Sequence, residues 1–279
     1  METKSDARCV ATIANRDPEQ MEQLKAVFAR CGASIVELPA DDSLRAAHLA
    51  KRRIDLVLLK LTTDRANRRI FGELQQADFR YLNSLRSVKL CQSRRATFAF
   101  ANRHLPDVRT PRMFVTPSEA SRAIADGRPV WVRRDAHNIP LEERVLGVAH
   151  TTGELDELIG DLEPRTLFFQ EYLGRTNDTY KAYVVGSSVV MLRRTELQDR
   201  LSQTPDAVVE RTTLRKDVED AILSIGRAFG MSVYGVDLFY RGDQAVFLDF
   251  NDFPSFRGIP EASQRIWEFV ATTHFRGGG

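Results

Sequence analysis

The chain has 279 residues, of which 43% are hydrophobic and 28% charged, and this composition is typical of a globular protein large enough for two or three lobes. Its net charge of +2 gives no reason to expect nucleic acid as a partner. Only seven of its 40 basic residues are Lys, so guanidinium groups are the main cations available for holding anions.

The cysteine count and the hydropathy pattern exclude several other classes. Cys9, Cys31 and Cys91 are too few and too scattered for a disulfide framework or a metal site, so a reducing cytoplasm is the expected location. No apolar run is long enough to span a membrane, and the polar start of the chain does not resemble a signal peptide. We expect no membrane partner, and the sequence leaves the oligomeric state open.

The first 85 residues alternate between strand-like and helical patterns. Strands are predicted over 8–14, 33–38 and 54–61, and helices over 18–31, over a short stretch after the second strand, and up to about Ala77. This alternation predicts a parallel three-layer unit. It contains neither GxGxxG nor GxxxxGK[ST], so neither a Rossmann fingerprint nor a P-loop is present.

The middle of the chain reads as a small lobe. A helix is predicted over 93–104, strands over 110–115, 129–134, 145–150 and 166–173, and helices over 118–126 and near Leu155. The last part begins with a hairpin over 179–194, followed by helix 214–229, strands 234–240 and 245–254, and helix 262–272. We therefore expect three domains, over residues 1–105, 106–172 and 173–279.

Three oxygen ligands stand out in the two strands near the end, namely Asp237, Asp249 and Asn251. Residues two apart in a strand share a face, so Asp249 and Asn251 should point together, away from a core formed by Val246, Leu248 and Phe250. Carboxylates beside an apolar layer need a cation, and Mg²⁺ suits carboxylate and amide oxygens. The alternative is that Arg side chains neutralise the two aspartates in structural salt bridges.

Several blocks of the sequence resemble the ATP-grasp superfamily, and most closely the inositol tetrakisphosphate kinases. They include IDLVLLKLTTD, PVWVRR, LFFQEYL, TYKAYVVG with MLRRTEL, and, most specifically, GVDLFY with FLDFNDFPSFRG. The resemblance implies an α/β fold with an α+β C-terminal part. An N-terminal parallel three-layer domain would precede a small central lobe and a C-terminal antiparallel-sheet lobe.

The resemblance also implies how a nucleotide would be held. Asp237, Asp249 and Asn251 would bind Mg²⁺, with Mn²⁺ as an alternative, and a hinge between the lobes, Gln170 to Leu173, would supply backbone hydrogen bonds to adenine. The implied ATP-binding residues are Arg94, Arg133, Gln170, Glu171, Tyr172, Leu173 and Asp178.

The sequence departs from the kinase pattern at two places. Arg94 and Arg133 stand where the family usually has two lysines that bind the nucleotide phosphates. The bulkier guanidinium groups either make the same phosphate contacts as the lysine ammonium groups or indicate a lost or altered affinity for the nucleotide. The His-Gly substrate motif is absent, and DAHNIPLEE stands in its place. His137 in that segment could meet a substrate anion or could simply be solvated.

The expected acceptor is a small anion held by basic residues beyond the hinge. Lys181 and Arg194 are the predicted catalytic residues, because alternation allows only one of Arg193 and Arg194 to face the site and family position favours Arg194. The predicted substrate residues are Lys60, Arg193, Ser255, Arg257 and Gly258. The alternatives are a solvated basic strand edge for the arginines and a surface lysine for Lys60.

Three functions remain open from the sequence. In an ADP-forming carboxylate–amine ligase, which we favour and which resembles the ribosomal-protein glutamate ligases and related ATP-grasp enzymes, ATP phosphorylates a carboxylate that is then joined to an amine. In an inositol-polyphosphate-type kinase, the acceptor is a hydroxyl of a phosphorylated polyol. In a degenerate nucleotide-binding protein, Arg94 and Arg133 no longer support turnover.

Overall fold

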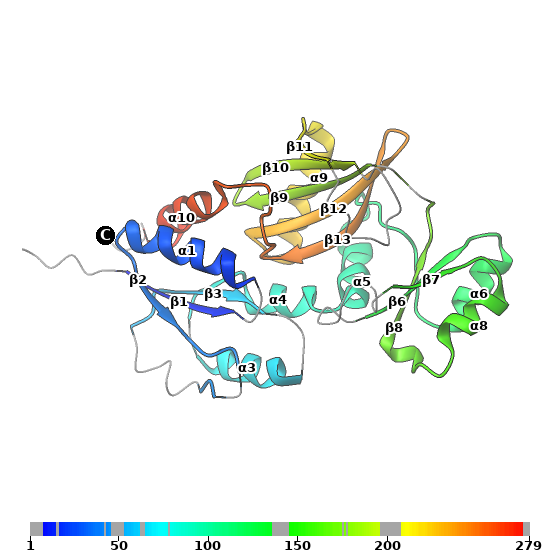
Figure 1. The fold of residues 1–279 in the computed structure, drawn as a ribbon, viewed down its shortest axis with the longest axis horizontal. Helices are drawn as coiled ribbons and strands as arrows, with labels where there is room; N and C mark the ends of the chain where they lie inside the picture. Colours follow the sequence, from blue (N-terminus) through cyan, green and yellow to red (C-terminus); the bar gives the residue numbers. More distant parts are fainter. Residues whose placement is uncertain are drawn as a thin grey trace, which may run out of the picture.

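The protein is built around three β-sheets in a row, as Figure 1 shows. The computed structural model describes residues 8–14, 17–41, 43–45, 53–61, 65–77, 79–135, 145–174, 176, 178–195 and 208–275. The N-terminal sheet lies at one end, the small central lobe at the other, and the C-terminal sheet between and above them. This arrangement confirms the predicted α/β fold with an antiparallel C-terminal part.

The N-terminal sheet is fully parallel, with the strand order β2-β1-β3-β4. Its strands are β1 (Cys9–Ala14), β2 (Ser34–Glu37), β3 (Leu56–Lys60) and β4 (Tyr81–Leu82), and its helices are α1 (Pro18–Arg30) and α3 (Arg65–Gln76). Helix α1 buries one stripe, formed by Met21, Leu24, Val27 and Phe28. Central strand β3 is buried at every position, as expected for a parallel strand covered on both faces.

The central lobe contains an antiparallel sheet in the order β5-β8-β6-β7. The strands are β5 (Met113–Phe114), β6 (Val130–Arg134), β7 (Val145–Ala149) and β8 (Leu167–Glu171). Helices α6 (Pro117–Ala125) and α8 (Thr152–Ile159) pack on it, and a 3₁₀ turn, η1 (Pro164–Thr166), precedes β8. The lobe therefore has its own hydrophobic core.

The C-terminal sheet has five antiparallel strands in the order β11-β10-β9-β12-β13. They are β9 (Asp178–Val185), β10 (Ser188–Thr195), β11 (Val208–Arg211), β12 (Val233–Arg241) and β13 (Gln244–Asp252). Helices α4 (Leu85–Cys91), α5 (Arg94–His104) and α9 (Lys216–Phe229) supply apolar side chains to the core on one face of this sheet. Gly230 ends α9 in the left-handed conformation at φ 72°, as its position after the apolar stripe predicts.

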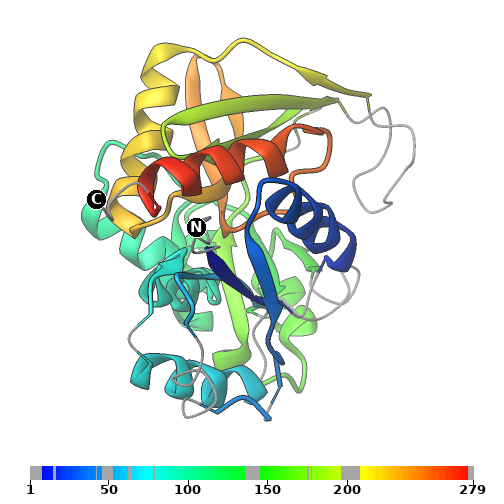
Figure 2. The same cartoon turned by 90° about the vertical axis from the view of Figure 1, so that its left-hand side faces the viewer.

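The N-terminal and C-terminal parts share a second core. Helix α10 (Ala262–Thr273) packs against α1, and both views show the two helices side by side. Figure 2 shows them lying between the C-terminal sheet and the parallel sheet. Helices α4 and α5 belong to the first proposed domain but pack on the C-terminal sheet, and α10 belongs to the third but packs on α1. The proposed domains 1–105 and 173–279 therefore share hydrophobic cores.

Strand β13 contains an irregularity that the sequence analysis did not foresee. Asp237 pairs with Asp249 and Leu238 pairs with Phe247, so Leu248 is the extra residue of a β-bulge. Strict alternation predicted Leu248 in the core, and that prediction is wrong. The bulge buries Phe247 instead and turns Leu248 toward the cleft between the two antiparallel sheets.

Candidate active site

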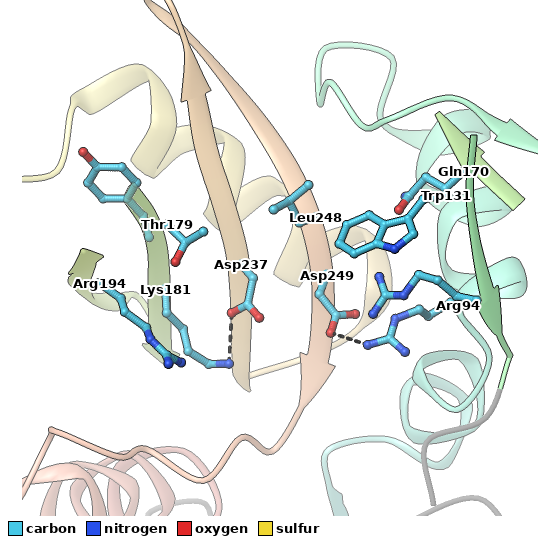
Figure 3. Close-up of a pocket in the computed structure, with 11 residues that line it drawn as sticks. Arg94, Trp131, Gln170, Thr179, Lys181, Arg194, Asp237, Leu248 and Asp249 are labelled. Carbon is cyan, nitrogen blue, oxygen red and sulfur yellow. Dashed lines mark hydrogen bonds and ion pairs between the residues drawn. The ribbon is translucent and has the colours of Figure 1, made fainter. Parts of the chain in front are cut away.

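A cavity of about 380 Å³ lies between the small lobe and the C-terminal sheet, and its size suits a nucleotide-scale ligand. Figure 3 shows charged side chains entering it from both sides. The lining residues come from α5 (Arg94), the small lobe (Trp131, Arg133, Gln170) and the C-terminal sheet (Thr179, Tyr180, Lys181, Arg194, Asp237, Leu248, Asp249).

Two ion pairs lie in this cavity. Arg94 Nη2 donates to Asp249 Oδ2 at 3.0 Å and thereby connects α5 to β13. Lys181 Nζ lies 2.9 Å from Asp237 Oδ1, connecting β9 to β12. The register places Asp237 directly opposite Asp249 and also opposite Lys181, so two carboxylates and two cations meet within three adjacent strands and one helix (Figure 3).

The protonation of Lys181 reflects this environment. Burial by itself would lower the pKa of its ammonium, but the adjacent Asp237 carboxylate, with a smaller contribution from Asp249, outweighs burial. The pKa of Lys181 is therefore raised above its ordinary value. The group stays charged at physiological pH, as an anion-binding residue requires.

Buried nitrogens from two of the residues that line the cavity have no hydrogen-bond partner among the described residues. They are Arg94 Nε, Arg94 Nη1 and Gln170 Nε2. Arg94 is 5% exposed and Gln170 is 2% exposed, so bulk water does not readily compensate for the missing partners. Leaving such donors unsatisfied costs about 1–3 kcal/mol each, and more when the group is charged. The cavity thus contains N–H donors on Arg94 and Gln170 that a bound ligand could use.

The small lobe is fixed to α5 through Asp135. Its Oδ1 accepts the backbone N–H of Arg94 at 2.9 Å, and its Oδ2 accepts the hydroxyl of the N-cap residue Ser93 at 2.8 Å. A carboxylate at this position also complements the dipole at the start of the helix. On the same lobe, Arg133 Cζ lies 4.9 Å from the centre of the Trp131 ring, within the range of a cation–π contact.

The predicted hinge continues from β8. The N–H groups of Glu171 and Tyr172 donate to the carbonyls of Arg112 and Pro129, each at 2.8 Å. Among the described residues, none accepts a hydrogen bond from the Leu173 N–H. Adenine recognition by this hinge therefore remains a prediction, and the Leu173 N–H is the backbone donor available for it.

Two predicted ligand-binding residues pair with each other instead of lining the cavity. Arg193 Nη2 donates to Asp178 Oδ2 at 2.7 Å, and Thr195 Oγ1 donates to Asp178 Oδ1 at 2.7 Å. The bonds from Arg193 and Thr195 hold the pKa of the Asp178 carboxyl below its usual range. The structure thus brings Arg194 to the cavity and directs Arg193 away from it, which agrees with the strand alternation.

The end of β13 and the loop after it do not line the cavity. Asn251 Nδ2 lies 3.3 Å from Asp249 Oδ2, so the two side chains share a face as predicted. In the loop that follows, Tyr183 Oη donates to the Arg257 carbonyl at 3.4 Å and Gly258 has a φ of +83°. The substrate roles predicted for Ser255, Arg257 and Gly258 stay predictions.

Lys60 requires a correction. The sequence placed it at a ligand-accessible strand end, with a surface lysine as the alternative, but the structure buries its side chain completely. Its ammonium lies 3.1 Å from Asp17 Oδ2, donates to the Pro254 carbonyl at 3.2 Å, and also donates to the side chain of Gln20. Lys60 therefore joins β3, the start of α1 and the loop after β13 rather than lining the cavity.

Some lining residues were missed in the sequence. Trp131 precedes Arg133 by two positions on β6, and Thr179 precedes Lys181 by two on β9, so alternation could have identified both. Leu248 could not be found in this way because of the bulge.

The described residues contain no group of three or more His, Cys, Asp or Glu side chains arranged to hold a metal ion. The predicted metal site relies on two carboxylates and the Asn251 amide, and it stays a prediction. His137 lies outside the described residues. None of the helices in the described part has the length and hydropathy needed to cross a bilayer.

Comparison with known proteins identifies the fold. Residues 143–266 match the family model of the RimK-like ATP-grasp domain. The two antiparallel sheets that enclose the cavity are those of the ATP-grasp fold, so this chain has that fold, and the matched segment runs from β7 into α10. No curated protein sequence is significantly similar to the chain.

Solved structures with the same fold cover almost the whole chain. A RimK domain ATP-grasp protein from Sphaerobacter thermophilus DSM 20745 is 19% identical, with a TM-score of 0.67 over 94% of this chain and 99% of its own. D-alanine–D-alanine ligase from Bacillus anthracis, complexed with ATP, is 13% identical, with a TM-score of 0.70 over 97% and 98%. The ATP-grasp ligase PsnB, complexed with a phosphomimetic variant of its minimal precursor, Mg and ADP, is 16% identical, with a TM-score of 0.66 over 95% and 99%.

Proposed function

We propose that this protein is an ATP-dependent carboxylate–amine ligase that releases ADP and phosphate. The observation that carries the proposal is the set of unpartnered donors on Arg94 and Gln170 in a cavity that also holds two opposed aspartates. The RimK-like domain match and the ligases that share the fold support ligation over other uses of the nucleotide.

The residues present fit a magnesium nucleotide. Arg94 offers the unused N–H groups of two nitrogens, Nε and Nη1, to an anion, which suits phosphate oxygens. Asp237 and Asp249 each hold a protein cation, which shows that both carboxylates require positive charge beside them. Mg²⁺ prefers oxygen ligands of this kind, and Asn251 could add an amide oxygen. Mn²⁺ suits the same ligands.

The chain's own residues would then have distinct tasks. Bound Mg²⁺ and ATP would supply the phosphoryl group that activates a carboxylate. Arg94 and Arg133 would hold phosphate oxygens, and Lys181 and Arg194 would bring the acceptor anion close to a negatively charged nucleotide. The small lobe would cover the site and exclude water, since α5 and Asp135 hold it over the cavity.

Hydroxylamine offers a test that does not require the natural amine. A ligase converts a carboxylate, ATP and hydroxylamine into a hydroxamate, ADP and phosphate, with one of each formed per turnover. We expect hydroxamate and free phosphate to appear together when the protein is incubated with Mg²⁺, ATP and a panel of carboxylic acids. Asp249→Asn is the inactive control.

Two other outcomes would contradict the proposal. The cationic acceptor side would also suit a phosphorylated polyol, and a stable phosphorylated product without free phosphate would establish kinase activity instead. A chain that binds no ATP at millimolar concentration, while the variant with Arg94→Lys and Arg133→Lys does, would identify a degenerate nucleotide-binding protein.

A further inference from the structure

Tyr183 of β9 is an aromatic neighbour of Lys181, which the proposed function assigns to the acceptor. The two residues are two positions apart on the strand, so their side chains share one face of the sheet. Lys181 Nζ lies 5.7 Å from the centre of the Tyr183 ring, within the range of a cation–π contact. The same ammonium lies 2.9 Å from Asp237 Oδ1, and Figure 3 shows this ion pair. Lys181 is therefore held by a carboxylate and by an aromatic ring.

The Tyr183 ring is itself fixed in place. It is 6% exposed, and its centre lies 5.4 Å from that of the Phe256 ring in the loop after β13. Its hydroxyl donates a long hydrogen bond, 3.4 Å, to the Arg257 carbonyl of the same loop. The backbone of Tyr183 is paired on both edges, with Val190 of β10 and Gly235 of β12. The ring is thus a preorganised surface for the ammonium.

An aromatic ring can hold an ammonium without cancelling its charge. The face of the ring is partially negative because of its quadrupole, but the ring has no net charge. Burial raises the pKa of the Tyr183 phenol and outweighs the opposing effect of the Lys181 charge, so the ring stays neutral at physiological pH. A second carboxylate in its place would also attract Lys181, but it would repel an anionic acceptor. The ring therefore leaves the positive charge of Lys181 available to that acceptor.

We propose that Tyr183 is a positioning residue that holds the Lys181 ammonium where the acceptor carboxylate binds, and this inference rests on the proposed function. Without the attraction of the ring, the carboxylates of Asp237 and, more weakly, Asp249 would alone set the position of the ammonium. The ammonium would then be drawn toward the predicted metal ligands and away from the acceptor. Tyr183 does not line the cavity, so it acts through Lys181 rather than by touching a ligand.

The test changes the charge distribution of the ring while keeping its shape. The side chain at position 183 is replaced by that of phenylalanine, in Tyr183→Phe, and by that of a trifluorinated phenylalanine, whose ring face is no longer negative. Phosphate release with Mg²⁺, ATP and hydroxylamine is measured against the concentration of the carboxylic acid that reacts best in the panel described above. Calorimetry gives the dissociation constant of ATP for each variant.

The same two replacements at Tyr240 are the matched control. Tyr240 is a tyrosine of the same sheet, and its ring centre lies 5.6 Å from Arg215 Cζ, but it does not line the cavity. Fluorination at this position weakens a cation–π contact of the same kind away from Lys181. We expect it to leave the KM for the acid unchanged.

Tyr183→Phe keeps the ring and should retain a KM for the acid within about two-fold of the native value. The trifluorinated ring should raise that KM about 3- to 10-fold relative to Tyr183→Phe, the scale of one cation–π contact. The value of kcat, the KM for hydroxylamine and the dissociation constant of ATP should stay the same, because Lys181 is not assigned to the nucleotide or to the neutral nucleophile.

The outcomes separate this inference from the proposed function. If phosphate is released but the KM for the acid is the same with the plain and the fluorinated ring, Tyr183 does not position Lys181, while the proposed function stands. An equal rise in KM on fluorination of Tyr240 would also overturn the assignment. If no acid supports the release of phosphate, the proposed function fails and this inference fails with it.

Discussion

Arg94 and Lys60 are both buried cations, yet their surroundings differ. The Lys60 ammonium contacts the Asp17 carboxylate, the Gln20 side chain and the Pro254 carbonyl, and it lies 5.6 Å from the centre of the Phe253 ring. Arg94 is hydrogen-bonded to one carboxylate, that of Asp249, and has two buried nitrogens, Nε and Nη1, whose N–H groups no described residue accepts.

The difference separates a structural role from a ligand-binding role. A buried charge whose donors are all used contributes to packing one element against another, and removing it affects folding. When a buried charged group has unused donors, the cost of removing them from water is offset only if a ligand accepts their hydrogen bonds. By this criterion Lys60 holds the N-terminal sheet to the loop after β13, whereas Arg94 is prepared for an anionic ligand.

The largest expected effect is on stability, at Lys60. Lys60→Met keeps most of the side-chain volume but removes the charge and leaves the Pro254 carbonyl without its donor. We expect a loss of about 3 kcal/mol in the free energy of unfolding, near the lower end for a broken buried pair because Asp17 is partly exposed. Urea denaturation measures it.

Lys216→Met is the control for that experiment. Lys216 also forms ion pairs, but its side chain is 75% exposed, so the change should stay within about 0.5 kcal/mol. Nucleotide affinity should be the same in the native chain and in folded Lys60→Met. A Lys60 variant with native stability and weakened ATP binding would show that Lys60 binds the ligand and does not serve a structural role.

Arg94→Ala should show the opposite pattern. It removes the cavity's unused donors, so we expect ATP binding to weaken by about 1.5–3 kcal/mol, the range for a hydrogen bond to a charged group. Arg94→Lys should retain much of the affinity. Arg103→Ala, an exposed position on the same helix, is the control. Equal calorimetric affinities for Arg94→Ala and the native chain would remove Arg94 from the nucleotide site.

Neighbouring residues on β10 allow a sharper version of the comparison. Arg194 lines the cavity, whereas Arg193 is held by Asp178 and Glu210. Arg194→Ala should lower the rate of acceptor-dependent phosphate release about ten-fold or more, while ATP affinity changes little. Arg193→Ala should leave that rate close to native. Similar losses in both variants would mean that general surface charge, rather than a directed contact, attracts the acceptor.

Much of the fold was predictable because local patterns and burial agree. The described strands β1 to β3 and helices α1 and α3, the hairpin at Gly186 and the helix stop at Gly230 were anticipated, whereas most of the segment of the short helix predicted after β2 lies outside the described residues. Helix α4 and strand β11 were not, and the exposed positions of β11 give no alternating signal. The grouping of Arg94, Lys181, Asp237 and Asp249 in one cavity also agrees with the sequence analysis.

What the sequence could not supply was tertiary context. A strand pattern does not reveal a bulge, so Leu248 was placed on the wrong face. The burial of Lys60 depends on residues about 40 and 194 positions away in the chain, which no local pattern encodes. The pairing of Arg193 with Asp178 likewise follows from strand register rather than from spacing.

The most direct test of the central claim, a magnesium nucleotide held by Asp249 and Arg94, is the Mg²⁺ dependence of ATP binding in Asp249→Asn. Calorimetry with Mg²⁺ and with EDTA should show that the native chain binds ATP at least about ten-fold more tightly when Mg²⁺ is present. Asp249→Asn should lose that gain, yet bind metal-free ATP as well as or better than the native chain, because one negative charge has gone. An affinity that is independent of Mg²⁺, or a Mg²⁺ effect that survives in Asp249→Asn, would contradict the account.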